Sequence, residues 1–447
     1  MDDEIEIPEY FICPISLQIM RDPVTTITGI TYDRESIERW ISDKIKSKSK
    51  NKIKNASVIV FCPVTKLPLP EDSDLLTPNH TLRRLIQSWC LDNATRGVDR
   101  IPTPRARLEI SNVVEMVKDL DSKRETVKKI EALAMESDRN RRLMVEAGVQ
   151  RSMISFIVKS FNEGIIEGIE ESLHVLHLIG VPSDEARTIL MDDDRILESL
   201  TWILRMESDT IKIMMNRSYT IELLRTLTEH TSSHIVERLN PEVFRGILGF
   251  IRDVNRMNSN PRRDVWAKEK NSVIKQAVSA ALMILLETSP WSRNRVSIIE
   301  SGAVHELIEL ELNSVPTEKR TTELVLGVLS RLCSCAEGRS RFLAHQGSIA
   351  TVTKRVFRIS PAADDRAIAI LNLVSKFSSA NTVVQEMVTV GTVSKLCTVL
   401  QVDFAVNLKE KAKEILRVHC DEFKKFPCVD EALLTKLVSS SSTRPKA

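Results

Sequence analysis

The sequence predicts a mostly α-helical protein in which a small α+β domain is followed by an α-solenoid. The chain of 447 residues contains only 13 glycines and 3 tyrosines, which argues against a protein built of strands and turns. Nine of its 17 prolines fall in the first 104 residues, so two architectures meet near that point. Beyond it, one sequence unit recurs about every 45 residues, a period typical of stacked helical repeats.

Composition and charge exclude several classes of protein. A net charge of +2 provides no whole-chain field that would attract nucleic acid or an anionic membrane. The acidic start at Met1 lacks the order of a secretory signal, and the apolar run from Gln276 to Leu286 is shorter than the roughly 20 residues that span a bilayer. The eight cysteines include no CxxC pair, which suits a reducing compartment. We expect a soluble cytoplasmic protein without nucleic-acid partner or membrane insertion, and a nuclear location stays open.

Residues 1–91 form the predicted α+β domain. The β-branched stretch from Val24 to Ile30 predicts a short hairpin. Asp33 and Asn79 each precede an amphipathic segment and are expected to be helix N-caps. The apolar faces of these two helices are expected to comprise Ile37, Trp40 and Ile41 in the first, and Leu82, Leu85, Ile86 and Trp89 in the second.

Cysteines at the starts of two proline-stiffened loops, Cys13-Pro14 and Cys62-Pro63, raise the question of a zinc site. A structural zinc ion takes four ligands, so a two-zinc fold needs eight. Residues 1–100 offer only Cys13, Cys62, Cys90 and His80, and no two have the spacing of a ligand pair. We therefore expect no metal and no other cofactor.

The first domain resembles the plant type of U-box, the zinc-free relative of the RING domain. Six motifs carry the resemblance in order: CPISL from Cys13, DPV from Asp22, TGITYDR from Thr28, a helix with Trp40, CPVT from Cys62 and TPNHTLRRLI from Thr77. In U-boxes, hydrogen bonds and ion pairs replace the zinc ions. Candidates for these structural contacts are Cys13, Ser16, Asp22, Asp33, Arg34, Cys62, Thr65 and Asn79, whose pairing the sequence does not define.

The resemblance implies an E3 ubiquitin-protein ligase that has no nucleophile of its own. Such a domain binds a ubiquitin-charged E2 enzyme and holds the thioester in a reactive pose, so that a substrate lysine attacks it. Ile15, Leu17 and Pro63 are implied to form the apolar E2-binding groove, with Trp40 supporting or lining it. Lys66 falls where a basic residue bridges E2 and ubiquitin, although lysine lacks the fork of arginine. Dimerisation through the U-box stays open.

Two features qualify this interpretation. Cys13 and Cys62 precede prolines and have no neighbouring histidine or helix N-terminus to lower the thiol pKa, so we expect buried packing residues, not nucleophiles. Residues 43–60 form an insertion in which lysines alternate from Lys44 to Lys54. A solvated, disordered loop is the expected state; the alternatives are self-ubiquitination, lipid or nucleic-acid binding, and a weakened U-box on a non-catalytic adaptor.

A linker is expected at 92–108 and armadillo-type helical repeats at 109–440, with a disordered tail at 441–447. The repeated unit contains a small residue between helices, as at Gly148, Gly302, Gly347 and Gly391, with Asp193 in the equivalent place. We expect about seven units, of which the last is a cap at Leu408–Phe423. The basic segment Arg252–Lys275 is expected to loop out, either as an insertion without a binding role or as a loop that contacts the substrate.

The array is predicted to bind a protein substrate. Import receptors with this architecture need repeated asparagines on the third helices, and of the equivalent positions His177, Thr226, Leu285, Arg331 and Asn372 only the last fits. The stretches starting at Glu170, Ser232 and Pro361 most resemble the plant ligases that regulate immunity and stress responses, which implies a role in restraining defence.

Overall fold

The computed structural model describes residues 7–49, 60–69, 76–94, 98, 108–120, 124–192, 195–206, 210–229, 236–237, 239–258, 268–313, 319–377 and 381–439. The chain forms two compact units, Met1–Arg107 and Leu108–Ala447, and each is described by itself. Most of the expected linker at 92–108, and the whole of the expected tail at 441–447, lie outside the described residues.

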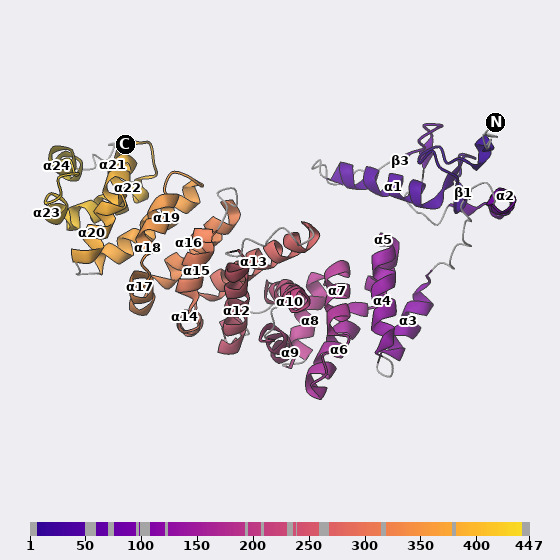
Figure 1. Cartoon of the computed structure of the whole chain (residues 1–447), viewed down its shortest axis with the longest axis horizontal. Coiled ribbons are helices and arrows are strands. Elements are labelled where there is room, and N and C mark those ends of the chain that lie inside the picture. The colour runs from indigo at the N-terminus through magenta and orange to yellow at the C-terminus, as the bar shows by residue number, and fades with distance from the viewer. Residues whose placement is uncertain are drawn as a thin grey trace. The chain divides into compact units, whose positions relative to one another are not determined.

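The first unit contains two small antiparallel sheets and two helices (Figure 1). Strand β1 (Pro23–Thr25) lies between β2 (Thr31–Asp33) and β5 (Thr77–Pro78), while β3 (Val60–Phe61) pairs with β4 (Pro68–Leu69). A 3-10 turn, η1 (Glu9–Phe11), precedes them, and the helices are α1 (Arg34–Ser49) and α2 (His80–Asp92). The expected hairpin is confirmed, but the pairing of β1 with β5 joins segments more than 50 residues apart and was not predicted.

The core of this unit is packed as expected except at two positions. Cys13, Cys62, Tyr32 and Ile37 are fully buried. Leu85, expected on the buried face of α2, is 52% exposed, and Cys90 is buried on that helix instead. The burial of Cys90 follows from helical geometry, because it lies four residues after Ile86, the other buried residue of α2.

The lysine-rich insertion is helical where the structure describes it. Helix α1 continues to Ser49, so the expectation of a disordered loop is wrong for residues 44–49. The Lys44 ammonium lies 4.6 Å from the centre of the Trp40 ring. A run of lysines has good helix propensity, and α1 continues into it without an intervening glycine or proline. Residues 50–59, which include Lys50, Lys52 and Lys54, lie outside the described residues.

The second unit is an array of stacked helices whose order along the chain is also their order in space (Figure 1). One layer consists of every third helix, each packed on the next: α4 (Glu125–Glu136), α7 (Ile169–Ile179), α10 (Ile211–Glu229), α13 (Lys268–Thr288), α16 (Lys319–Leu332), α19 (Pro361–Lys376) and α22 (Val406–Val418). A second layer consists of α6 (Val149–Glu163), α9 (Arg195–Leu204), α12 (Pro241–Asn258), α15 (Ala303–Asn313), α18 (Ser348–Arg355) and α21 (Thr392–Gln401).

Short first helices precede those of the second layer: α5 (Asp138–Glu146), α8 (Ser183–Asp192), α14 (Ser292–Glu300), α17 (Ala336–Leu343) and α20 (Asn381–Thr389). Helix α3 (Ile110–Asp119) precedes α4 and packs on α4 and α5. Gly148, Gly302 and Gly391 join first to second helices with φ angles of 72°, 90° and 78°. These left-handed conformations suit glycine, which explains why the repeated unit carries one there. Gly347 has a φ of −97°, so the backbone conformation of this copy of the unit does not require glycine.

Two predictions about the array were wrong. The segment Arg252–Lys275 does not loop out as a whole, because Arg252–Asn258 completes α12 and Lys268–Lys275 begins α13; only 259–267 lie outside the described residues. Its apolar positions, such as Val254 and Ile274, are buried and hold both ends in the core. The unit at Leu408–Phe423 is not the last, because α24 (Glu431–Ser439) follows α23 (Cys420–Phe423) and packs on α21 and α22, within the expected array of 109–440.

Within the described residues, no single helix has the length and apolar composition of a membrane span. One bent pair, Thr382–Thr389 with Thr392–Gln401, meets those criteria jointly, with a 68° angle between its halves.

Candidate functional site

The two proline loops of the first unit share one backbone plan. In the first loop, the Cys13 N–H donates to the Gln18 carbonyl and the Leu17 N–H donates to the Cys13 carbonyl, both at 2.9 Å. The second loop repeats this at Cys62, which donates to Leu67 at 2.8 Å and accepts from Lys66 at 3.1 Å. The motifs Cys-Pro-Ile-Ser-Leu and Cys-Pro-Val-Thr-Lys therefore fold into equivalent turns.

Both turns place a non-glycine residue in the left-handed region. Leu17 has a φ of 56° and Lys66 a φ of 60°, at the same position of each turn. Such conformations are uncommon for residues with a side chain and persist when the surrounding structure enforces them. The two side chains predicted to contact E2 and ubiquitin thus extend from strained positions on fixed turns.

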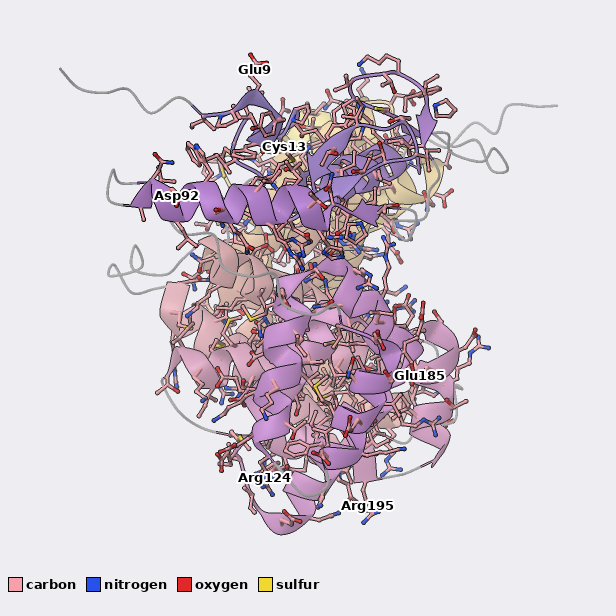
Figure 2. All side chains as sticks on the ribbon, turned by 90° about the vertical axis from the view of Figure 1, so that its right-hand side faces the viewer. Glu9, Cys13, Asp92, Arg124, Glu185 and Arg195 are labelled. Atoms are coloured by element: carbon pink, nitrogen blue, oxygen red, sulfur yellow. The ribbon has the colours of Figure 1, made fainter. Side chains whose placement is uncertain are left out.

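The thiols of Cys13 and Cys62 anchor the two turns from inside the unit. The Cys13 Sγ accepts from the Asp33 N–H at 3.3 Å. The Cys62 Sγ lies 3.0 Å from the Tyr32 hydroxyl and 3.4 Å from both the Thr28 hydroxyl and the Thr65 N–H. Cys13 is fully buried, whereas Glu9, labelled in Figure 2, projects from the periphery of the unit.

These donors change the acidity of the thiols. Burial raises the pKa of Cys62, but the hydrogen bonds from Thr28, Thr65 and Tyr32 outweigh it and lower that pKa to about 6. The pKa of Cys13 is also lowered, since the hydrogen bonds that involve Ser16, Asp33 and Ile15 outweigh burial. No neighbouring histidine or helix N-terminus was expected to lower these pKa values. The lowering comes instead from hydrogen bonds, some within the same turn, from Ser16 and Thr65, and others from Thr28, Tyr32 and Asp33. Both thiols are fully buried, as expected for packing residues.

Asp22 is the ionic centre that joins the hairpin to both helices. Its Oδ2 accepts from the Arg34 Nε at 2.6 Å, and its Oδ1 pairs with the Arg83 guanidinium from α2. Asp33 was expected to cap α1, but the hydrogen bonds described for its carboxylate go to the N–H groups of Arg21 and Asp22, at 2.8 and 2.9 Å. Asn79 caps α2 as predicted, since its Oδ1 accepts from the Leu82 N–H at 3.0 Å.

The candidate E2-binding surface combines exposed and half-buried apolar side chains. Leu17 is 77% exposed, whereas Ile15 and Pro63 are half-buried. Trp40 is also half-buried, and its Nε1 donates to the Phe61 carbonyl at 3.1 Å, which ties α1 to β3 beside the second turn. Val64 is 51% exposed and was missed, although it occupies in the second motif the place that Ile15 occupies in the first.

Lys66 extends along its own turn. Its Nζ donates to the Pro63 carbonyl at 2.8 Å, and the side chain is exposed. One exposed hydrogen bond of this kind contributes little, so the ammonium group is available to a bound partner at low cost.

In the array, polar side chains bridge neighbouring helices of the third-helix layer. The His174 Nδ1 lies 2.7 Å from the Glu131 Oε1, and the His177 Nδ1 lies 2.7 Å from the Glu222 Oε2. Both imidazoles pack on the Tyr219 ring, at centroid distances of 5.5 and 4.7 Å. Asn372, the single asparagine that fitted the import-receptor pattern, donates to the Glu414 Oε2 at 3.1 Å. These contacts tie adjacent repeats together.

Within the described residues, one group could offer three ligand atoms to a metal: His305, Glu309 and His345, with candidate atoms within 4.8 Å of one another. The His345 Nδ1 accepts from the Gly347 N–H at 3.2 Å, so the neutral ring carries its proton on Nε2. That Nε2 lies 3.0 Å from the Glu309 Oε1 and donates to it. Glu309 and His345 thus form a hydrogen bond that links α15 to the segment after α17.

The fold and the paired turns define a class of protein: a U-box joined to an armadillo array. The U-box domain family matches residues 7–95, and the family described as "Plant U-box protein ARM repeat region" matches residues 109–439. The Arabidopsis thaliana protein named E3 ubiquitin-protein ligase PUB24 is 57% identical over 474 residues, covering 100% of this chain and 99% of that protein. E3 ubiquitin-protein ligase PUB23 of the same plant is 37% identical and covers 97% of this chain and 98% of that protein.

The chain belongs to the family of plant U-box E3 ubiquitin-protein ligases with armadillo repeats. Ligases of the U-box type act as RING-like ubiquitin transferases and form no covalent intermediate with ubiquitin, so E2 and ubiquitin are the partners of this domain. A designed armadillo repeat protein, YIII(Dq)4CqI, aligns with a TM-score of 0.40 and 16% identity over 60% of this chain and 100% of that one, a likeness too distant to add to this assignment.

Proposed function

We propose that the two turns at 13–18 and 62–67 together form the E2-docking surface of this ligase. Ile15, Leu17, Pro63 and Val64 supply its apolar contacts, and Trp40 supports them through its bond to Phe61. The observation that carries the proposal is the coincidence of exposure with rigidity. Leu17 is 77% exposed, yet its turn is held by backbone hydrogen bonds and a buried thiol. An exposed leucine on a rigid frame costs little entropy when it binds.

Lys66 acts as a positioning residue for the bound E2–ubiquitin conjugate. Its ammonium leaves the Pro63 carbonyl and donates to acceptors at the junction of E2 and ubiquitin. Holding the thioester in a reactive arrangement lowers the barrier for the attacking lysine without any nucleophile on this chain. Lysine offers a point charge where arginine would offer a fork, so the clamp is weaker than an arginine clamp would be.

The U-box works without zinc. The support is the set of contacts around the places where a RING domain would hold metal: Cys62 is surrounded by three donors, and Asp22 joins Arg34 and Arg83. These contacts stabilise the loops directly, in the way that ligand–metal bonds would.

The armadillo array binds the protein substrate, and the ligase acts in the cytoplasm, with access to the nucleus, as a regulator that restrains plant defence and stress responses. The support is likeness to relatives with the same two-part organisation, PUB24 at 57% and PUB23 at 37% identity. A homodimer formed through the U-box would hold two charged E2 enzymes together.

The test is the discharge of ubiquitin from a charged E2 onto free lysine by the full chain, with and without a metal chelator. We expect acceleration that survives chelation, falls by more than about tenfold in Ile15→Ala because a central apolar contact is lost, and falls by a smaller factor in Lys66→Ala. No acceleration across a panel of E2 enzymes would favour a non-catalytic adaptor. Activity restored by deleting residues 44–55 would instead identify the lysine-rich insertion as a brake.

A further inference from the structure

A cavity of about 750 Å³ opens on the second-helix layer of the array, where α9, α12 and the end of α14 meet. Four residues of α12 that share one helical face line it: Arg245, Gly249, Arg252 and Arg256. Arg205 follows α9 at one side, and Glu300 and Ser301 end α14 at the other. We call this the arginine cavity.

The floor of the arginine cavity is a buried guanidinium. Arg217 of α10 is 4% exposed. Its Nη1 donates to the Asp253 Oδ2 at 2.6 Å and its Nη2 to the Gly246 carbonyl at 3.2 Å, while its Nε finds no partner among the described residues. A Cβ at position 249 would lie 3.1 Å from that Nη2, so the glycine leaves the guanidinium uncovered.

The arginines around the opening are incompletely neutralised. Arg205 and Arg245 share one carboxylate, Glu242, and Arg256 lies 3.5 Å from Asp253, which already pairs with the floor arginine. Arg252 uses its Nε for Glu306, at 2.8 Å. Among the described residues, these five guanidinium groups therefore have four carboxylates near them: Glu242, Asp253 and Glu306 pair with them, and Glu300 lines the cavity. Each guanidinium carries five hydrogen-bond donors. Donors exceed acceptors at this site although the chain as a whole is nearly neutral.

Size and chemistry together define the ligand. The volume falls within the range of roughly 300–1,000 Å³ typical of small-molecule sites. Guanidinium forks match phosphoryl oxygens in pairs, and several of them around one space favour a ligand with several such groups. The exposed ion pairs at the rim rearrange at little cost. We propose that the arginine cavity binds a small organic polyphosphate, and that the ligand bridges three successive repeats.

This binding is independent of E2, so it can be measured apart from ligase activity. The probe is myo-inositol hexakisphosphate, titrated calorimetrically into the full chain. Arg245→Gln with Arg256→Gln removes two rim arginines that are 61% and 72% exposed in their side chains, so the fold is unaffected. We expect a one-to-one complex whose Kd rises roughly 10- to 100-fold in this double variant, because two charge-assisted contacts are lost.

The matched control removes the same charge elsewhere in the array, through Arg320→Gln with Arg341→Gln, and should leave the Kd unchanged. Gly249→Leu keeps every charge but fills the floor, and should abolish binding. Its melting temperature without ligand is measured alongside, because the added Cβ lies 3.1 Å from the Arg217 Nη2. Equal loss in both double variants, or undiminished binding in Gly249→Leu, would show diffuse attraction and overturn the proposal. So would binding no tighter than that of sulfate, or a phosphoserine peptide that binds more tightly than the probe.

Discussion

The two proline turns of the U-box have the same backbone and different supports. The turn at 13–18 is held through Asp33, whose N–H contacts Cys13 and whose carboxylate binds the backbone of Arg21 and Asp22. The turn at 62–67 is held through one thiol with three donors. The first presents an apolar leucine and the second a cation at the same left-handed position. In the proposed function, the same backbone design would therefore supply E2 affinity at one turn and ubiquitin positioning at the other.

The largest effect expected from a substitution comes from removing the ionic centre next to the first turn. Asp22→Ala removes the carboxylate that pairs with Arg34 and Arg83, whose side chains are 14% and 16% exposed, and leaves Arg34 with the longer contact to Glu38, at 3.7 Å. We expect a loss of about 3 kcal/mol in unfolding free energy of the first unit, because uncompensated buried charge is costly. Hydrogen exchange should quicken in residues 13–18 before residues 62–67. Asp365→Ala, which breaks an exposed pair with Lys411, is the control and should change stability by under about 1 kcal/mol.

The second turn should carry a pH dependence. The folded state lowers the pKa of Cys62 to about 6 from an ordinary value of 9.0. Between these values the unfolded chain holds a proton that the folded chain lacks, so stability rises with pH. The stabilising contribution of Cys62 is complete above pH 9 and is lost as the pH falls to about 6. The free energy of unfolding changes over this range with a slope of up to about 1.4 kcal/mol per pH unit.

Hydrogen exchange of the Thr65 and Lys66 amides across that range measures this slope. Cys62→Ser should flatten it, since a serine hydroxyl does not ionise there. An equal slope in the serine variant would mean that another group is responsible.

A smaller effect is expected from removing one donor to the second turn. Tyr32→Phe deletes the hydroxyl 3.0 Å from the Cys62 Sγ and keeps the buried ring. We expect a loss of about 1 kcal/mol, the usual contribution of one intramolecular hydrogen bond, with faster exchange confined to residues 62–67. Equal loosening of residues 13–18 would show that the two turns do not have separate supports.

The smallest expected change separates stability from activity. Lys66→Gly removes a side chain from a residue with a φ of 60°, so it relieves strain and should stabilise the turn by up to about 1 kcal/mol. Ubiquitin discharge should nevertheless fall, because the positioning cation is gone. Thermal unfolding and discharge assays on the same variant test both halves. A variant that is destabilised, or fully active, would contradict the assigned role.

Local signals in the sequence were sufficient for much of this account. The capping asparagine at 79, the hairpin and the glycine-marked repeats were predictable because each depends on a few neighbouring residues. Asp22 joins Arg83 across 61 positions, β1 pairs with β5 across more than 50, and two of the three donors to Cys62 come from residues 28 and 32. Those contacts depend on the path of the whole chain, so neither these partners nor their share in lowering the thiol pKa could be predicted locally.

Contacts between segments distant in sequence also limited what could be predicted for the armadillo array, the E2-docking surface and the arginine cavity. Apolar periodicity predicted the third helices, but the charged end of α12 suggested a loop because its burial comes from neighbouring repeats. Val64 could have been found by aligning the two cysteine–proline motifs with each other. The arginine cavity has no comparable signal, since α9, α10, α12 and α14 contribute to it from residues 204–301.

The most direct test of the E2-docking surface is the Kd of an E2 enzyme for the full chain, compared between Leu17→Ala and Leu85→Ala. Both leucines are more than half exposed in the same unit, at 77% and 52%, but only Leu17 lies on a proline turn. We expect a rise in Kd of roughly 30-fold for Leu17→Ala, the cost of losing a central apolar contact, and almost none for Leu85→Ala. Equal Kd values for the two variants would contradict the assignment of the turns as the docking surface.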